Sequence, residues 1–139
     1  MTSRNLTGVL DTSALIDLGR LDPSSLPAAP SITTVSLAEL SVGPHVAHSD
    51  SERAARQAHL QQAEADFEPI PFDTAAARAF GRVASALRAS GRKPAARAYD
   101  ALIAATALSR DLPVYTANPR DFDGIDGLMV HTVQYVAES

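Results

Sequence analysis

Short apolar runs alternate along this chain with longer stretches in which apolar residues recur at helical spacing. The short runs, which are typical of buried strands, occupy residues 6–10, 32–35, 112–116 and 128–133. The helical patterns follow Asp11 and cover residues 36–42, 51–67, 74–90 and about 94–110, and glycine or Gly-Pro ends several of them. Strands that alternate with helices predict an α/β fold with a mostly parallel sheet and helices on both faces.

The composition agrees with one globular domain over residues 1–139, with 45% hydrophobic and 20% charged residues. The chain has no cysteine, which excludes disulfides and thiolate metal sites and is typical of a cytosolic protein. Neither a long apolar stretch nor the apolar core of a signal peptide occurs. We therefore expect a cytoplasmic protein with no membrane partner.

The charges are unevenly distributed. The net charge of −4 argues against nucleic acid as a partner, yet six of the twelve basic residues lie between Arg78 and Arg97, a stretch without any acid. This stretch is either a solvated helix face or a positive surface beside an acidic pocket.

Asp100 is the most informative single residue of the chain. It is the only charged residue in the run Ala98 to Leu108, which is apolar on nearly every side and therefore predicts a buried helix. Burial of an unpaired carboxylate costs several kcal/mol or forces it to take up a proton. A basic partner, hydrogen-bond donors or a metal ion must therefore compensate Asp100.

Two further acids occupy unusual positions. Asp11 ends the first apolar run, where a plain helix cap would contribute about 1 kcal/mol. Glu39 shares a predicted helix face with Val35 and Val42, so simple solvation does not account for it.

Arginine pairing is one way to compensate these acids. Arg97 precedes Asp100 by three positions, but such a pair contributes only about 0.2–0.5 kcal/mol on an exposed helix surface. Carboxylates gathered in one pocket also repel each other, by about 4 kcal/mol per pair at about 4 Å and an effective dielectric near 20. A divalent cation removes both costs, and an all-oxygen ligand set favours Mg²⁺ or Mn²⁺ over Zn²⁺.

Four segments together resemble the motifs of a known family. In order and spacing they are similar to the motifs of PIN-domain ribonucleases, especially the VapC-type toxins of prokaryotic toxin-antitoxin pairs, and they span nearly the whole chain. The segments are Asp11-Thr12-Ser13-Ala14-Leu15-Ile16, Ala38-Glu39-Leu40, the run Tyr99 to Ala107, and Thr116-Ala117-Asn118-Pro119-Arg120-Asp121-Phe122.

The resemblance implies a PIN-like three-layer fold and an Mg²⁺- or Mn²⁺-dependent endoribonuclease that hydrolyses RNA by metal-activated water. Asp11 and Asp100 would bind the ion directly, and Glu39 would act through a bound water or help to hold a second ion. The fourth acidic position is either Asp121, which we favour, or the position of Asn118.

Further residues receive supporting roles on the same basis. Ser13 and Thr116 would hold the ligands by hydrogen bonds, and Asn118 would act in the same way or contact the substrate. Arg92, Lys93 and Arg97 are candidate contacts to the RNA backbone. The family also implies a cognate VapB-type antitoxin that masks the acidic pocket, and a homodimer.

Three alternatives belong to other classes. The chain could be a PIN-like domain that has lost most of its catalysis and binds RNA or a protein partner. A phospho-receiver domain is disfavoured, because it needs a lysine near the site and a second acid beside Asp11, whereas the only lysine is Lys93 in a Gly-Arg-Lys-Pro turn. A phosphatase that forms an aspartyl-phosphate needs a second Asp where this chain has Ser13.

Overall fold

The computed structural model describes residues 7–92 and 97–137. The strands are β1 (Thr7–Leu10), β2 (Ala29–Ser31), β3 (Val114–Thr116) and β4 (Val130–Thr132). The α-helices are α1 (Thr12–Ile16), α2 (Thr34–Val42), α3 (Asp50–Asp66), α4 (Thr74–Ala89) and α5 (Ala98–Ser109). Short 3-10 helices cover η1 (Leu18–Arg20), η2 (Pro23–Ser25), η3 (Gly43–Val46) and η5 (Pro119–Phe122).

The strands form one parallel sheet in the order β2-β1-β3-β4. Val9 of β1 is opposite Val114 of β3, and Leu10 is opposite Tyr115, so the carboxyl ends of the two central strands lie side by side. Residues that follow these strands are therefore brought to the same edge of the sheet.

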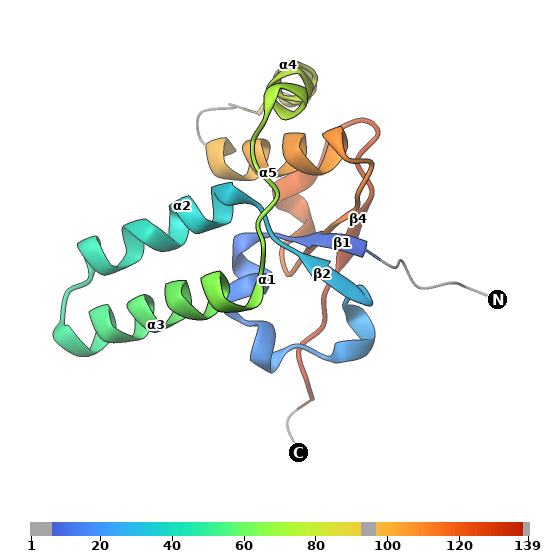
Figure 1. The fold of residues 1–139 in the computed structure, drawn as a ribbon. Coiled ribbons are helices and arrows are strands. Elements are labelled where there is room, and N and C mark those ends of the chain that lie inside the picture. Colours follow the sequence, from blue (N-terminus) through green and yellow to red (C-terminus); the bar gives the residue numbers. More distant parts are fainter. Residues whose placement is uncertain (1–6, 93–96, 138–139) are drawn as a thin grey trace.

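Helices cover both faces of this sheet (Figure 1). Because side chains alternate along a strand, Val9 packs with α4 and α5 in one core cluster, whereas the neighbouring Leu10 packs with Ala14 and Ala63 in the other. The layers of α4 and α5 on one side and of α1, α2 and α3 on the other confirm the predicted α/β fold.

The second strand differs from the prediction. The pattern at residues 32–35 predicts a strand, but β2 ends at Ser31 and α2 begins at Thr34. Thr33 accepts a hydrogen bond from the backbone N–H of Ser36 and so caps α2. Pro30 can lie in β2 because β2 is an edge strand, where a missing N–H is tolerated.

The first helix is also shorter than its sequence pattern, because α1 ends at Ile16 and the 3-10 helix η1 follows it. The other predicted elements agree with the structure to within a few residues. Pro94, the predicted start of the helix that carries Asp100, lies outside the described residues. In the described part of the chain, no helix combines the length and the apolar character that crossing a membrane requires.

Candidate active site

Asp11 lies directly after β1 and is 2% exposed. Its Oδ2 accepts a hydrogen bond from the Thr116 hydroxyl at 2.6 Å, and its Oδ1 accepts one from the backbone N–H of Ala14 at 2.9 Å. The Ser13 hydroxyl donates at 3.0 and 3.1 Å to the two oxygens. Thr116 accepts from the backbone N–H of Asn118 at 3.0 Å, so its own proton is free to point at Asp11. Asp11 is therefore both the cap of α1 and a buried carboxylate held in one orientation.

Glu39 lies on α2 and is half-buried. Its Oε1 accepts a hydrogen bond from the Thr12 hydroxyl at 2.6 Å, and Thr12 lies 2.9 Å from the hydroxyl of Ser36. These hydroxyls join α1 to α2 beside Asp11. The sequence does not predict a role for Thr12 or Ser36 at the site, and its only signal for one is that small hydroxyl residues lie close to the two acids.

Asp100 lies in the first turn of α5 and is half-buried. No described residue donates a hydrogen bond to it. Burial, and then the negative charges of Asp121, Asp11 and Glu39 in that order, together raise the pKa of Asp100 to about 6, although Arg97 lowers it. The burial of the Asp100 carboxylate is therefore only partly compensated by the protein itself, through the charge of Arg97.

The other two acids show the same tendency. Burial raises the pKa of Asp11 against its three hydrogen bonds, and burial likewise raises the pKa of Glu39 against the hydrogen bond from Thr12. The charge of Asp11 adds to the shift of Glu39, and the charge of Asp121 adds to that of Asp11. Mutual repulsion of this kind identifies a group of neighbouring carboxylates.

Asp121 and Asn118 are both close to this group, but they differ in exposure. Asp121, on η5, is half-buried and forms an ion pair with Arg97. Asn118 is exposed and contributes its backbone N–H to Thr116. Arg97 therefore does not pair with Asp100 along the helix. It precedes the first turn of α5, and its guanidinium extends to Asp121 on η5.

The donor chemistry of the site fits a hard divalent cation, because carboxylate and hydroxyl oxygens converge with no sulfur and no imidazole. As the side chains lie, no three His, Asp or Glu residues in the described ranges are grouped closely enough to hold one ion. Two of the acids are engaged instead by internal partners: Asp11 by its three donors and Asp121 by Arg97. An ion bound here would therefore have to draw neighbouring carboxylates closer to that of Asp11, which is already held in one orientation.

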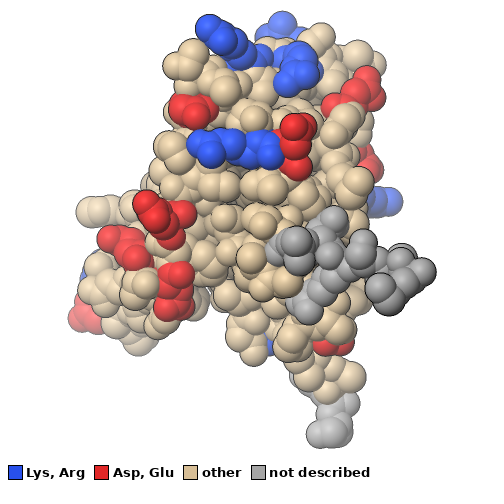
Figure 2. Space-filling view, turned by 45° about the vertical axis from the view of Figure 1, so that its right-hand side comes forward, with Lys and Arg blue, Asp and Glu red and all other residues tan. Residues whose placement is uncertain are grey.

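The basic stretch is divided between the surface and internal partners. Arg78, Arg82 and Arg88 lie exposed on α4, and Figure 2 shows Lys and Arg side chains at the top of the molecule where α4 lies. Arg92 donates to the carbonyl of Arg120 at 2.6 Å, and one of its nitrogens lies 3.7 Å from Asp123. Lys93 lies outside the described residues.

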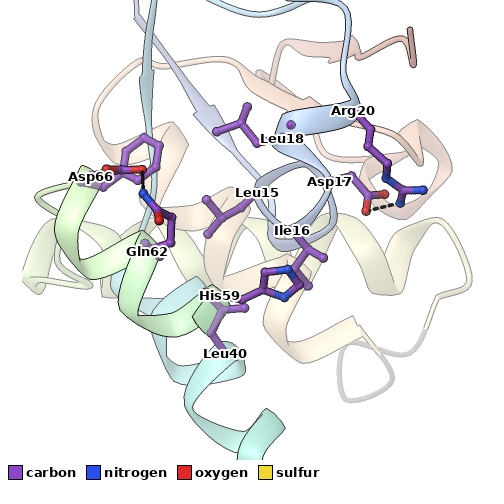
Figure 3. A pocket seen from close by; sticks show the side chains of 12 residues that line it. Leu15, Ile16, Asp17, Leu18, Arg20, Leu40, His59, Gln62 and Asp66 are labelled. Carbon is purple, nitrogen blue, oxygen red and sulfur yellow. Dashed lines mark hydrogen bonds and ion pairs between the residues drawn. The ribbon is translucent and has the colours of Figure 1, made fainter. Parts of the chain in front are cut away.

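A pocket with a volume of about 540 Å³ lies between α1, α2 and α3 (Figure 3). Its apolar side chains include Leu15, Ile16 and Leu40, and His59 of α3 faces Ile16. A smaller hollow of about 260 Å³ shares Ile16, Leu40 and His59 with it and is also lined by Glu39. An apolar pocket is thus continuous with the edge of the acidic site.

Comparison with known proteins agrees with this arrangement. The family model of the PIN domain matches residues 8–128. Ribonuclease VapC5 of Mycobacterium tuberculosis is 43% identical over 130 residues, which cover 91% of this chain and 93% of that protein.

Solved structures give the same result for the fold. The crystal structure of VapBC-5 from Mycobacterium tuberculosis, a member of the VapBC family of toxin-antitoxin systems, matches with a TM-score of 0.79 and 40% identity over 91% of this chain and 98% of that one. VapBC2 from Rickettsia felis, bound to a DNA fragment from its promoter, has the same fold with a TM-score of 0.70, 20% identity and coverage of 91% and 98%. The buried Asp11 after β1 and the half-buried Asp100 at the start of α5 thus occur in a chain that belongs to the PIN-domain family, among the VapC-type ribonucleases.

Proposed function

We propose that this protein is the toxin of a type II toxin-antitoxin pair and an endoribonuclease that depends on Mg²⁺ or Mn²⁺. Family membership makes it a hydrolase that acts on RNA. The observation that carries the metal dependence is the mutual electrostatic influence of Asp11, Glu39 and Asp100, three neighbouring carboxylates whose pKa values are all raised. A divalent cation offsets both the burial and the mutual repulsion of such a group.

Asp11 and Asp100 are the proposed direct ligands, with Glu39 as a third ligand or a holder of bound water. When bound, the ion would activate a water for in-line attack on a phosphodiester and stabilise the charge that develops on the phosphoryl oxygens. The hydroxyls of Thr116 and Ser13 keep Asp11 oriented toward the site.

Glu39 is suited to take the proton of the attacking water. Its Oε1 accepts the hydrogen bond from Thr12, and no described residue donates to its Oε2. Burial raises the pKa of Glu39 toward the range in which a carboxylate is an effective general base. We propose that Thr12 fixes the carboxylate so that Oε2 faces the reaction.

A VapB-type antitoxin is the proposed protein partner, as in the complexes of the matched relatives. The pocket between α1, α2 and α3 offers apolar contacts, and the smaller hollow that shares Ile16 and His59 with it extends to Glu39. A partner segment in this pocket would reach the acidic site and mask it. The homodimer implied by the family stays a prediction.

The test is cleavage of total RNA by the purified full chain with Mg²⁺ or Mn²⁺, with and without EDTA, followed by sequencing of the new 5′ ends. We expect new ends that disappear with EDTA and with the variant Asp100→Asn. Asp126→Asn is the matched control, because Asp126 is an exposed acid in a turn.

Cleavage that survives EDTA, or that Asp100→Asn performs as fast as the wild type, would contradict the metal assignment. RNA binding without any cleavage would favour a PIN-like domain that only binds.

A further inference from the structure

Within the described residues, the side chains of Arg97 and Asp121 form an ion pair and make no other hydrogen bond or ion pair, and Arg97 lies three residues before Asp100. Arg97 immediately precedes α5, Asp121 belongs to η5, and Nη1 of the guanidinium contacts Oδ1 of the carboxylate. The side chains are 39% and 27% exposed. The pair therefore lies at the boundary between the acidic site and solvent.

One edge of the Arg97 guanidinium has no partner among the described residues. Nη1 contacts Asp121, whereas Nε and Nη2 have no hydrogen-bond acceptor among the residues that the structure describes. These two N–H groups point in parallel from one side of the planar group, and such a fork matches two oxygens of a phosphate. A carboxylate that holds the opposite side fixes the direction of this free edge.

The charge of the site calls for such a cation. One divalent ion cannot neutralise the four carboxylates Asp11, Glu39, Asp100 and Asp121, and an RNA phosphodiester adds a further negative charge. Arg92, another basic residue of this stretch, is already engaged by Asp123 and the carbonyl of Arg120. Arg97 lies three residues before Asp100 at the start of α5 and pairs with Asp121, so its charge lies beside the acidic site.

We infer that Asp121 is not an ion ligand but a positioning residue for Arg97, and that Arg97 presents its Nε and Nη2 edge to the RNA phosphodiester at the cleavage site. This inference rests on the proposed function for its substrate. This role uses the contact that Asp121 makes in the structure, where Oδ1 accepts from the Arg97 guanidinium.

The first test measures Mn²⁺ binding to the full chain by titration calorimetry, without RNA. We expect Asp100→Asn to weaken Mn²⁺ affinity by at least about tenfold and Asp121→Asn to leave it unchanged. Arg97→Ala removes a neighbouring positive charge and should leave Mn²⁺ affinity unchanged or increase it. A loss of affinity in Asp121→Asn as large as that in Asp100→Asn would overturn the inference.

The second test measures cleavage of a single-stranded RNA oligonucleotide with saturating Mn²⁺. We expect Arg97→Ala to lower the cleavage rate about 100-fold, because a preorganised donor to the phosphoryl oxygens is lost. Arg97→Lys should recover little of it, since an ammonium has no fork. Asp121→Asn in the Arg97→Ala background should add no further loss, because the two residues act as a unit.

Arg110→Ala and Asp73→Asn form the matched control, since Arg110 and Asp73 make an ion pair of similar exposure between other elements, 3.4 Å apart. Both changes should leave Mn²⁺ affinity and cleavage as in the wild type. Full cleavage by Arg97→Ala, or losses that add in the double variant, would overturn the inference.

If Arg97→Ala fails to fold, Arg97→Lys and Asp121→Asn carry the same comparison. If the wild type cleaves no RNA, the proposed function fails, whereas the Mn²⁺ titrations still decide whether Asp121 is a ligand.

Discussion

The site has two halves that hold a carboxylate in opposite ways. At the end of β1, Asp11 is 2% exposed and receives hydrogen bonds from two hydroxyls and one backbone N–H. At the start of α5, Asp100 is half-buried, lacks any donor among the described residues and is surrounded mainly by negative charge. Hydrogen bonds partly offset the burial of Asp11, whereas no described donor offsets the burial of Asp100.

The difference shows where binding energy for a cation comes from. Asp11 is oriented before any ion arrives, so little entropy is lost there on binding. Asp100 relieves an unfavourable charge when an ion arrives, since the repulsion from Asp121, Asp11 and Glu39 is then offset. Orientation at one half and relief of repulsion at the other are separate contributions, and mutations can separate them.

The largest effect should come from replacing either acid. Asp11→Asn and Asp100→Asn should each lower RNA cleavage by about 10³-fold, because each removes a proposed direct ligand. The effect on stability should differ: in EDTA near neutral pH, Asp100→Asn should raise the unfolding midpoint in urea, whereas Asp11→Asn should change it little. Destabilisation by Asp100→Asn would show that this carboxylate is not a cost to the fold.

Thr116→Val should test the preorganised half. The change keeps the shape of the side chain but removes the 2.6 Å hydrogen bond to a buried carboxylate, so we expect a loss of about 1–3 kcal/mol in the free energy of unfolding. Urea denaturation measures it. A neutral result would mean that Asp11 needs no support from β3.

The pH dependence of the unfolding midpoint should report the ionisation of Asp100. The pKa of Asp100 is raised from 3.8 to about 6 in the folded chain, so its contribution to stability is present at low pH and is lost as the pH rises through about 6. Without metal, the unfolding midpoint should therefore fall between about pH 4 and about pH 6, and Asp100→Asn should flatten this fall. Asp17, Asp22 and Asp73 have lowered pKa values and act below this window. Equal slopes for the variant and the wild type would assign the effect to other groups.

Ser13→Ala should have the smallest effect. Ser13 donates to both oxygens of Asp11 at 3.0 and 3.1 Å, but Thr116 and the N–H of Ala14 remain in the variant. We expect a loss of about 0.5–1 kcal/mol, measured in the same way as for Thr116→Val. A loss larger than that of Thr116→Val would reverse the ranking of the two hydroxyls.

Much of the fold is readable from the sequence because its signals are local. The run before Asp11 is a strand, Asp73 caps α4, and the apolar pattern around Asp100 is a buried helix. The strand expected at residues 32–35 is wrong because Thr33 starts a helix, and a hydroxyl that caps a helix and a β-branched strand residue look alike in sequence. Local patterns do not distinguish the two.

Only those site residues can be predicted from the sequence whose own position is unusual, such as a charge in an apolar helix. Asp100 stands out in an apolar helix, and its raised pKa confirms that its burial is costly. The role of Thr12 depends on how α1 packs against α2, and the pairing of Arg97 with Asp121 joins positions 24 residues apart. Such contacts are set by tertiary packing, which periodicity does not encode.

The double use of Asp11 has an evolutionary consequence. Its Oδ1 caps α1, and asparagine caps helices as well as aspartate does. A change of one base converts an aspartate codon into an asparagine codon, so a duplicated gene can lose catalysis while its product keeps the fold and the surfaces that bind other proteins. An inactive copy of this fold that still binds an antitoxin, and so acts as a decoy for it, can therefore arise by a single base change.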